Sequence, residues 1–171
     1  VVDSGGFDNV PTSSTFLVGS DNRVNSNGVT YVAYCFAEKT GYSKFGKYIG
    51  NNNEDGAFVY LGFKPAFVMV KIIDTQTDNW AMYDNKRNSG SLANGNPNGR
   101  YLKPNSNSAE ANSTRLDFLS NGFKQYNDNG TENQNGETYI YMAFGQSLVG
   151  SNNILLLPTR LCPCLLYTSP S

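Results

Sequence analysis

Hydrophobic residues along this chain occur in short runs of the length of β-strands, bounded by Asn, Gly, Asp and Pro. Val, Ile, Tyr and Phe dominate the runs, and the 3.6-residue period of helices is nearly missing. The runs cover residues 31–38, 44–49, 57–63, 66–73, 78–84, 116–119, 123–126 and 138–144. Seven of them lie beyond residue 40, with turn residues about every 8–12 positions. The pattern predicts an all-β fold, an antiparallel β-sandwich of jelly-roll or immunoglobulin-like type.

Details of the runs refine this expectation. Residues 66–73 are almost continuously apolar, which favours a central strand covered on both faces. The dipeptide Asn121-Gly122 between two hydrophobic runs predicts a hairpin. Residues 85–112 carry few apolar anchors and read as one long irregular loop, and such loops are usually functional or mobile. Residues 127–136 are expected to form another polar turn.

A similarity within the chain indicates its organisation. Residues 27–38 read NGVTYVAYCFAE and residues 135–146 read NGETYIYMAFGQ, so that Thr30 aligns with Thr138. The offset between these two threonines is too long for a solenoid repeat and has the size of one domain. We therefore expect tandem modules: the C-terminal part of a preceding module at residues 1–39, and one complete module at residues 40–150.

The end of the sequence is set aside from fold reasoning. Residues 164–171 read CLLYTSPS, which is what a transposase mosaic-end adapter used in sequencing libraries would encode. We interpret these residues as adapter-derived and residues 151–163 as a tail or linker. The sequence also begins without Met, so we expect it to be a fragment.

The amino-acid composition excludes several kinds of catalytic and binding site. The chain contains no His, which removes Ser-His-Asp and Cys-His catalysis and His-based metal sites. Its net charge of −1 gives no sign of the basic surface that binds nucleic acid. The sequence also lacks a long apolar run of the kind that inserts into a membrane. Cys35 lies in a strand-like run and aligns with Ala143, so we expect a small buried side chain. We expect no metal and no cofactor.

Five blocks resemble a known family: TYVAYCFAE, GYSKFGKYIGNNNEDGAFVYLGFKPAFVMVK, NWAMYDNKR, DFLSNGFK and TYIYMAFGQ, in that order. They look like a repeated domain of unknown function in tail-fibre-like and structural proteins of marine bacteriophages. The resemblance covers roughly residues 15–149 and departs from the family pattern at Gly145 and Gln146. It implies a virion location, on a phage tail, with assembly in the host cytoplasm. It supplies no catalytic residues.

A cluster of aromatic and polar residues is the main candidate site. The stretch NWAMYDNKR holds the possible ligand-binding residues Trp80, Tyr83, Asp84, Asn85 and Arg87. An aromatic face can stack on a sugar ring, while Asp, Asn and Arg can bond to hydroxyl groups. Alternatively, the aromatic residues pack in the core and the polar residues form a solvated turn. Both interpretations stay open from sequence alone.

Two further groups of residues are weaker candidates. Hard oxygens in the turn at residues 51–55 could suit Ca²⁺, but they lack the ordered spacing of an EF-hand, which favours a plain turn. Scattered carboxylates could form an acid/base pair for glycoside hydrolysis. They are Asp74, Asp78, Asp84, Glu110 and Asp117. Because no nucleophile constellation accompanies them, we expect no enzyme.

Together these observations predict a structural repeat module of a phage tail or fibre protein that contributes to adhesion at the host surface. The alternative is a lectin-like carbohydrate-binding module of a larger adhesin or depolymerase. The expected partners are other tail or virion proteins and host surface glycans, without nucleic acid. Resemblance to fibre proteins also suggests a homotrimer.

Overall fold

A computed structural model describes Gly6 and residues 12–74, 78–87, 98–125 and 130–146. The chain divides into two compact units, Val1–Phe36 and Ala37–Ser171. Each unit is considered by itself. The predicted tail, linker and adapter-derived segments lie outside the described residues.

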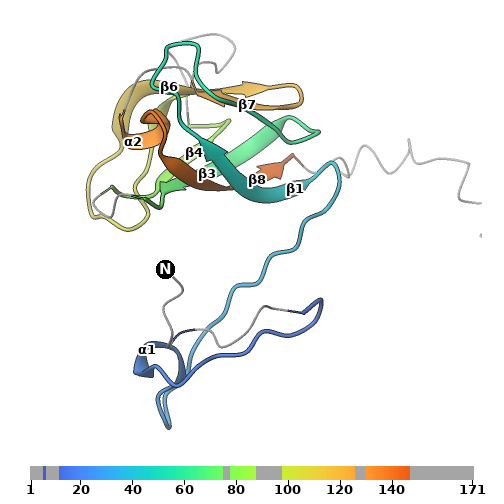
Figure 1. The fold of residues 1–171 in the computed structure, drawn as a ribbon, viewed down its shortest axis with the longest axis vertical. Helices are drawn as coiled ribbons and strands as arrows, with labels where there is room; N and C mark the ends of the chain where they lie inside the picture. The colour runs from blue at the N-terminus through green and yellow to red at the C-terminus, as the bar shows by residue number, and fades with distance from the viewer. Residues whose placement is uncertain (1–5, 7–11, 75–77, 88–97, 126–129, 147–171) are drawn as a thin grey trace, which may run out of the picture. The chain divides into compact units, whose positions relative to one another are not determined.

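The second unit contains all the strands that the structure assigns (Figure 1). They are β1 (Ser43–Ile49), β2 (Phe58–Tyr60), β3 (Pro65–Ile72), β4 (Ala81–Asp84), β5 (Asn98–Tyr101), β6 (Ala111–Leu119), β7 (Gly122–Gln125) and β8 (Thr138–Gly145). A short helix, α2 (Gly130–Asn133), precedes β8. The first unit holds another short helix, α1 (Asn22–Asn25).

The strands form two antiparallel sheets, with the orders β1-β8-β3-β4 and β2-β7-β6-β5. The sheets make the two layers of a sandwich in Figure 1. The predicted all-β antiparallel sandwich is therefore confirmed. Four strands in each sheet match the strand count of a jelly roll rather than that of a constant-type immunoglobulin domain. The last strand, β8, lies in the middle of its sheet.

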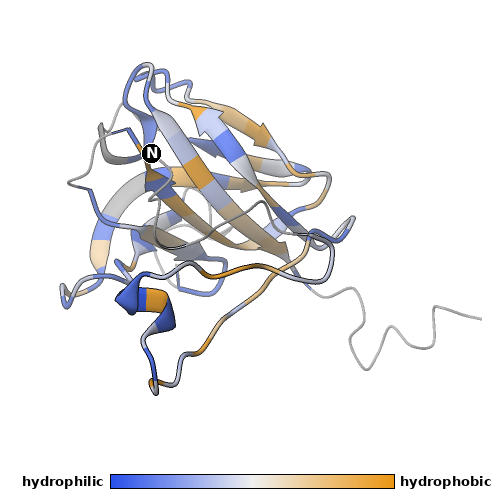
Figure 2. Cartoon of the chain, turned by 60° about the horizontal axis from the view of Figure 1, so that its bottom comes forward, coloured by the Kyte–Doolittle hydropathy of each residue, from blue (hydrophilic) through white to orange (hydrophobic). Residues whose placement is uncertain are grey.

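The core lies between the two sheets and follows from strict alternation along the strands. On β3 and β8, every second side chain points inward and is buried, as Val68, Val70 and Ala143 show. The rings of Tyr48 and Tyr139 stack with centroids 5.0 Å apart. In the second unit, colouring by hydropathy shows most hydrophobic residues in the strands and mostly hydrophilic residues in the loops (Figure 2). A sandwich of this size buries enough apolar area to fold without disulfides.

The predicted hairpin at Asn121-Gly122 is confirmed, because β6 and β7 pair with Leu119 opposite Gly122. A glycine is needed here for a second reason. A Cβ at Gly122 would lie 2.1 Å from the carbonyl oxygen of Val59 on the neighbouring β2. The turn is therefore fixed by a backbone approach between strands as well as by its own geometry.

Three predictions from the sequence are wrong. Residues 31–38 do not form a strand, since no strand is assigned there, and Cys35 among them is exposed. Residues 85–112 are not one loop, because they contain β5 and the start of β6. The polar turn at 127–136 contains α2. For β5 the deciding interaction is tertiary, because it has only Tyr101 as an apolar residue and becomes a strand by pairing with β6.

Candidate functional site

The predicted ligand-binding cluster lies on and after β4, and the alternation of the strand splits it. Ala81 and Tyr83 point into the core, and Met82 and Asp84 point outward. Trp80, just before the strand, is partly buried, and its backbone N–H donates to the side-chain oxygen of Asn105 at 3.0 Å. Tyr83 is fully buried and cannot contact a ligand at the surface.

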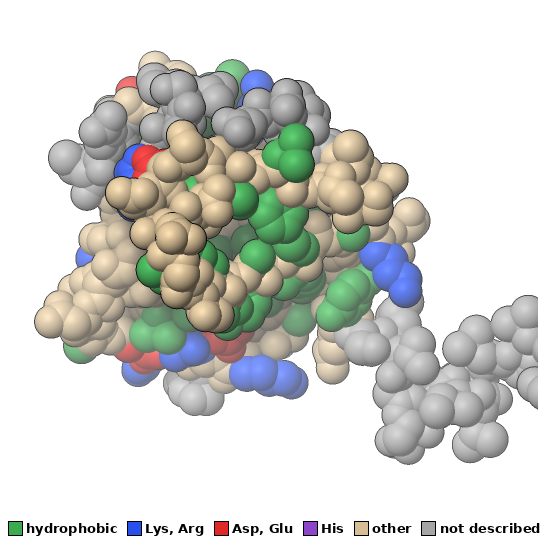
Figure 3. Space-filling view, turned by 90° about the horizontal axis from the view of Figure 1, so that it is seen from below, with side chains coloured by type: hydrophobic (Ala, Val, Ile, Leu, Met, Phe, Trp, Pro, Cys, Tyr) green, Lys and Arg blue, Asp and Glu red, His purple; other side chains and the backbone are tan. Residues whose placement is uncertain are grey.

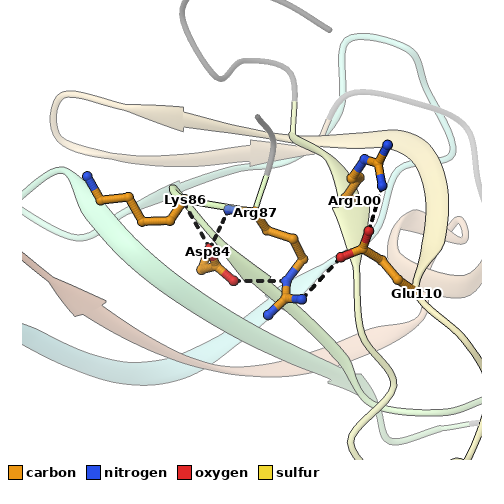
Figure 4. A network of polar contacts seen from close by, with 5 residues as sticks. All are labelled: Asp84, Lys86, Arg87, Arg100 and Glu110. Atoms are coloured by element: carbon orange, nitrogen blue, oxygen red, sulfur yellow. Dashed lines mark hydrogen bonds and ion pairs between the residues drawn. The ribbon is translucent and has the colours of Figure 1, made fainter. Parts of the chain in front are cut away.

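Asp84 organises the turn that follows β4 (Figure 4). Its Oδ1 atom accepts hydrogen bonds from the backbone N–H groups of Lys86 at 2.9 Å and Arg87 at 2.7 Å. Its Oδ2 atom accepts from Nε of Arg87 at 2.9 Å. The backbone of Asn85 donates to Ala66 on β3 and ties the turn to the sheet. Asp84 and Arg87, spaced as Asp-x-x-Arg, therefore hold the turn closed by local hydrogen bonds.

Glu110 extends this turn into a charged network that spans β4, β5 and the start of β6 (Figure 4). Its Oε2 atom lies 3.1 Å from Nη1 of Arg87, and its Oε1 atom lies 2.7 Å from Nη1 of Arg100. Hydrogen bonds from Arg100 and Arg87 lower the pKa of Glu110. The hydrogen bond to Glu110 raises the pKa of Arg87. The network of Asp84, Arg87, Arg100 and Glu110 therefore pairs two acidic with two basic side chains, so that its formal charges balance.

This network is suited to binding and poorly suited to acid/base catalysis. A general acid needs a carboxyl group with a raised pKa, whereas that of Glu110 is lowered. Arg100 remains about half exposed at 48%, so part of its guanidinium group faces solvent. Planar guanidinium groups beside carboxylates can bond to neighbouring hydroxyl groups. Of the predicted set, the structure brings Asp84 and Arg87 together and adds Arg100 and Glu110 to them.

The other candidate carboxylates are dispersed. Asp74 accepts a hydrogen bond from the backbone of Thr138 at 2.5 Å. Asp117 lies on β6, and partial burial raises its pKa. Within the described part of the chain, Asp84 and Glu110 alone among the five share a partner, which is Arg87. The sequence list therefore does not assemble into one site.

The turn proposed for Ca²⁺ uses its oxygens internally. Side-chain oxygens of Asn51 and Asn53 accept backbone N–H groups of the same turn, at 3.2 and 2.8 Å. Asn133 on α2 closes the arrangement, since its amide donates to Oδ1 of Asn51 at 3.0 Å and to the carbonyl of Asn53 at 3.1 Å. Asp55 forms an ion pair with Lys124. Among the described residues, no group of three potential His, Cys, Asp or Glu ligands could hold a metal ion.

A second polar cluster, which we did not foresee, lies buried beneath α2. The Glu132 carboxylate is almost fully buried and accepts a hydrogen bond from the Tyr83 hydroxyl at 2.5 Å. It also pairs with Nη1 of Arg115 at 3.1 Å. The hydroxyl of Tyr48 donates to the Glu132 carbonyl at 2.7 Å and accepts from Gln125 at 2.8 Å. This cluster fastens α2 to both sheets.

Burial dominates the electrostatics of this cluster. It raises the pKa of Glu132, and the positive charge of Arg115 opposes that shift without cancelling it. Arg115 in turn lies over the ring of Tyr101, with 4.8 Å from its guanidinium carbon to the ring centroid. Burial also raises the pKa of Tyr83 well above its usual value.

Sequence patterns contain little that would reveal this cluster. Glu132 lies in an Asn- and Gly-rich stretch that reads as a solvated turn, and Arg115 lies on a strand next to the inward-facing Leu116. The pairing of β5 with β6 shifts register between Asn98 and Arg100, where β6 carries extra residues. An irregularity of this kind changes the direction in which side chains point, and it accounts for the inward orientation of Arg115.

A row of apolar side chains crosses the outer face of the β1-β8-β3-β4 sheet. Phe45 on β1 is paired with Met142 on β8, Met142 with Met69 on β3, and Met69 with Met82 on β4. These residues alternate with the buried ones and so point away from the core, where they are partly exposed. We call this surface the outer face. An antiparallel sheet with one solvated face usually carries polar residues there.

Aromatic rings continue the outer face beside this row. The ring of Phe144 contacts those of Phe45, Tyr42 and Phe67, with centroids 5.8, 6.1 and 6.1 Å apart. Ile49, at the end of β1, is 63% exposed. Figure 3 views the whole chain from below Figure 1 and shows hydrophobic side chains at the surface in the middle of the view, with most charged side chains nearer its margins; it does not distinguish the outer face from the first unit.

A family model for a domain of unknown function, DUF7483, matches residues 3–147. The chain belongs to the DUF7483 family. The prediction that most of this chain is a domain of unknown function is thereby confirmed, and the match begins well before β1. No curated protein and no solved structure matches the chain. Within its described part, this DUF7483 chain contains no helix long and apolar enough to span a bilayer.

Proposed function

We propose that this DUF7483 chain is a non-catalytic structural module that assembles with other proteins through the outer face. The observation that carries the proposal is the row from Phe45 to Met82, which places apolar side chains on the solvent side of an antiparallel sheet. Large exposed apolar patches on folded domains mark interaction sites. Aromatic residues and Met are also enriched at such interfaces.

The setting that we propose is a phage tail or fibre, where the module acts as a spacer and contributes to adhesion at the host surface. The resemblance of five sequence blocks to tail-fibre-like proteins supports this setting, and so does the sandwich fold. Modules linked in an array gain avidity from weak contacts, so a shallow binding surface is sufficient. The partners are then other virion proteins, in a homotrimer or another assembly.

A charge placed at the centre of the outer face tests the assembly role. Met69→Lys should leave the fold intact, because the side chain points outward, and it should abolish association at concentrations where the wild-type chain self-associates or binds tail proteins. Phe58→Lys is the matched control, because Phe58 is an exposed aromatic residue on β2 of the other sheet. Sedimentation velocity and circular dichroism report the association and the fold.

Two outcomes would contradict the proposed role of the outer face. If the wild-type chain and Met69→Lys sediment alike and bind tail proteins alike, the outer face has no role in assembly and the proposal fails. If Phe58→Lys alone disrupts association, the interface lies on the other sheet.

The second candidate function is carbohydrate binding at the charged network. It is favoured by the guanidinium groups of Arg87 and Arg100, which lie beside Asp84 and Glu110 and offer planar hydrogen-bond partners. Trp80, which precedes β4 and is partly exposed, supplies the ring face in this proposal. A glycan array with the whole chain tests it. Arg87→Ala and Trp80→Ala should each remove binding without unfolding the protein. If no glycan binds at millimolar concentration, this alternative is excluded.

A further inference from the structure

Residues 29–37 are an apolar segment to which the structure assigns no strand. Val32 is 76% exposed and Tyr34 is 83% exposed, and residues 29–38 have no regular secondary structure. The segment VTYVAYCFA carries no charge and is almost continuously apolar. Its composition is that of a buried central strand, so exposure to solvent is unfavourable.

The local structure before this segment repeats the structure before β8. Helix α1 ends at Asn25 and α2 ends at Asn133, and these two residues differ in number by the same offset as Thr30 and Thr138. A glycine with positive φ follows each helix, Gly28 at 75° and Gly136 at 80°, again with the same offset. The repeat seen in the sequence is therefore also a repeat in backbone conformation.

The hydrogen bonds agree residue by residue. The backbone N–H of Ser26 donates to the hydroxyl of Tyr31 at 3.0 Å, and that of Gln134 donates to the hydroxyl of Tyr139 at 2.9 Å. The backbone N–H of Val29 donates to the Ser26 carbonyl at 3.2 Å, and the equivalent bond from Glu137 to Gln134 is also 3.2 Å. The two turns therefore make equivalent hydrogen bonds to the segments that follow them.

The two segments differ in the burial and contacts of the residues that follow the turn. Tyr139 enters a sheet, is fully buried and stacks on Tyr48, whereas its counterpart Tyr31 is 42% exposed. On β8 the inward positions continue through Ala143, which is fully buried. Its counterpart is Cys35, whose small thiol would suit the same buried position.

Among the described residues of the first unit, the structure assigns no strand that could flank this segment. β8 lies between β1, which begins at Ser43, and β3, which begins at Pro65. The β1 and β3 of this chain already hold β8 between them.

We propose that residues 29–37 are a donor strand that closes a second copy of the β1–β7 framework, occupying there the position that β8 holds here. The inward side would present Tyr31, Ala33 and Cys35. The outward side would present Val32 and Tyr34 and so continue an apolar outer face. The two modules would then be joined directly, because the residues after the donor strand lead into β1 of the next module.

A duplicated chain tests this assignment. A copy of residues 37–134 is placed before Asn27 of the chain, so that Asn27 follows Gln134 with the spacing found before β8. The readout is the alkylation rate of the Cys35 thiol, mapped by mass spectrometry. In the original chain the exposed thiol should react rapidly, and in the duplicated chain its reaction should slow at least a hundredfold.

Two controls make the result decisive. Val32→Pro should leave the stability of the original chain unchanged, but it should restore rapid alkylation in the duplicated chain, because a central strand cannot accommodate proline. A reference chain carries the β8 sequence, with Cys in place of Ala143, as the donor strand. If the reference is protected and the natural segment is not, the proposal is overturned. If neither is protected, the framework cannot be closed by a strand in this linkage, and the proposal is overturned as well.

Discussion

Replacing Arg115 with Met removes the cationic partner of a carboxylate that lies almost entirely inside the sandwich. In the wild-type protein, the Glu132 side chain has 2% relative exposure, with Nη1 of Arg115 at 3.1 Å and the Tyr83 hydroxyl at 2.5 Å. In Arg115→Met, the Glu132 carboxylate loses Arg115 and keeps the Tyr83 hydroxyl as a donor. Breaking a buried pair in this way typically costs about 3–5 kcal/mol. At roughly 4 °C per kcal/mol for a module of this size, Tm should fall by about 12–20 °C.

The double-mutant cycle isolates the pair from the packing. Glu132→Gln should cost less than Arg115→Met, because the Arg115 side chain is 11% exposed and can reach water more easily. The double variant removes both charges and should be more stable than the sum of the two single losses predicts, by about 1–3 kcal/mol. Urea unfolding followed by the fluorescence of Trp80, the single Trp of the chain, measures all four proteins.

The pH dependence supplies an independent check. Burial already raises the pKa of Glu132, and loss of Arg115 should raise it further. A carboxyl group with a raised pKa in the folded state contributes stability that is present below its unfolded pKa of 4.5 and is lost as the pH rises through its folded pKa. The deficit of Arg115→Met should therefore be larger at pH 8 than at pH 5, and Glu132→Gln should abolish the difference.

Additive losses would refute this reasoning. If the effects of the two single substitutions sum to that of the double variant within about 0.5 kcal/mol, the two side chains are not coupled. If the deficit of Arg115→Met is the same at pH 5 and pH 8, the Glu132 carboxylate is not buried as described.

Three further predictions concern the framework around the site. Gly122→Ala should destabilise the fold by about 3 kcal/mol or more in urea unfolding, because its Cβ would overlap the Val59 carbonyl, whereas Gly136→Ala should cost only about 1 kcal/mol for its positive φ. Asn133→Ala should cost about 2–3 kcal/mol by thermal unfolding, because it removes three hydrogen bonds of about 1 kcal/mol each between the buried Asn133 side chain and the exposed turn at residues 51–53; a loss below about 0.5 kcal/mol would contradict that view. Arg87→Ala should leave Tm nearly unchanged in calorimetry, because partly exposed ion pairs contribute little, and a large fall would show that the network is structural.

Much of the fold follows from local patterns in the sequence. Short apolar runs bounded by turn residues specify β1, β3 and β8, because runs of this length that are rich in β-branched and aromatic residues are typical of strands. Asn121-Gly122 specifies the hairpin, because its residues suit the tight turn. The repeat that aligns Thr30 with Thr138 is also visible in the letters, and it marks a second segment with the character of β8.

Tertiary structure decided what those patterns left open. Residues 29–37 and β8 have nearly the same sequence pattern, yet one is exposed and the other is a central strand, because sheet formation requires neighbouring strands. β5 has no apolar alternation and exists because β6 pairs with it. The candidate site followed the same rule: the sequence placed Asp84 and Arg87 in one turn, but only the folding of β5 and β6 brought Arg100 and Glu110 to them. Burial of Tyr83 against Glu132 likewise depends on a contact between distant parts of the chain, which no local pattern encodes.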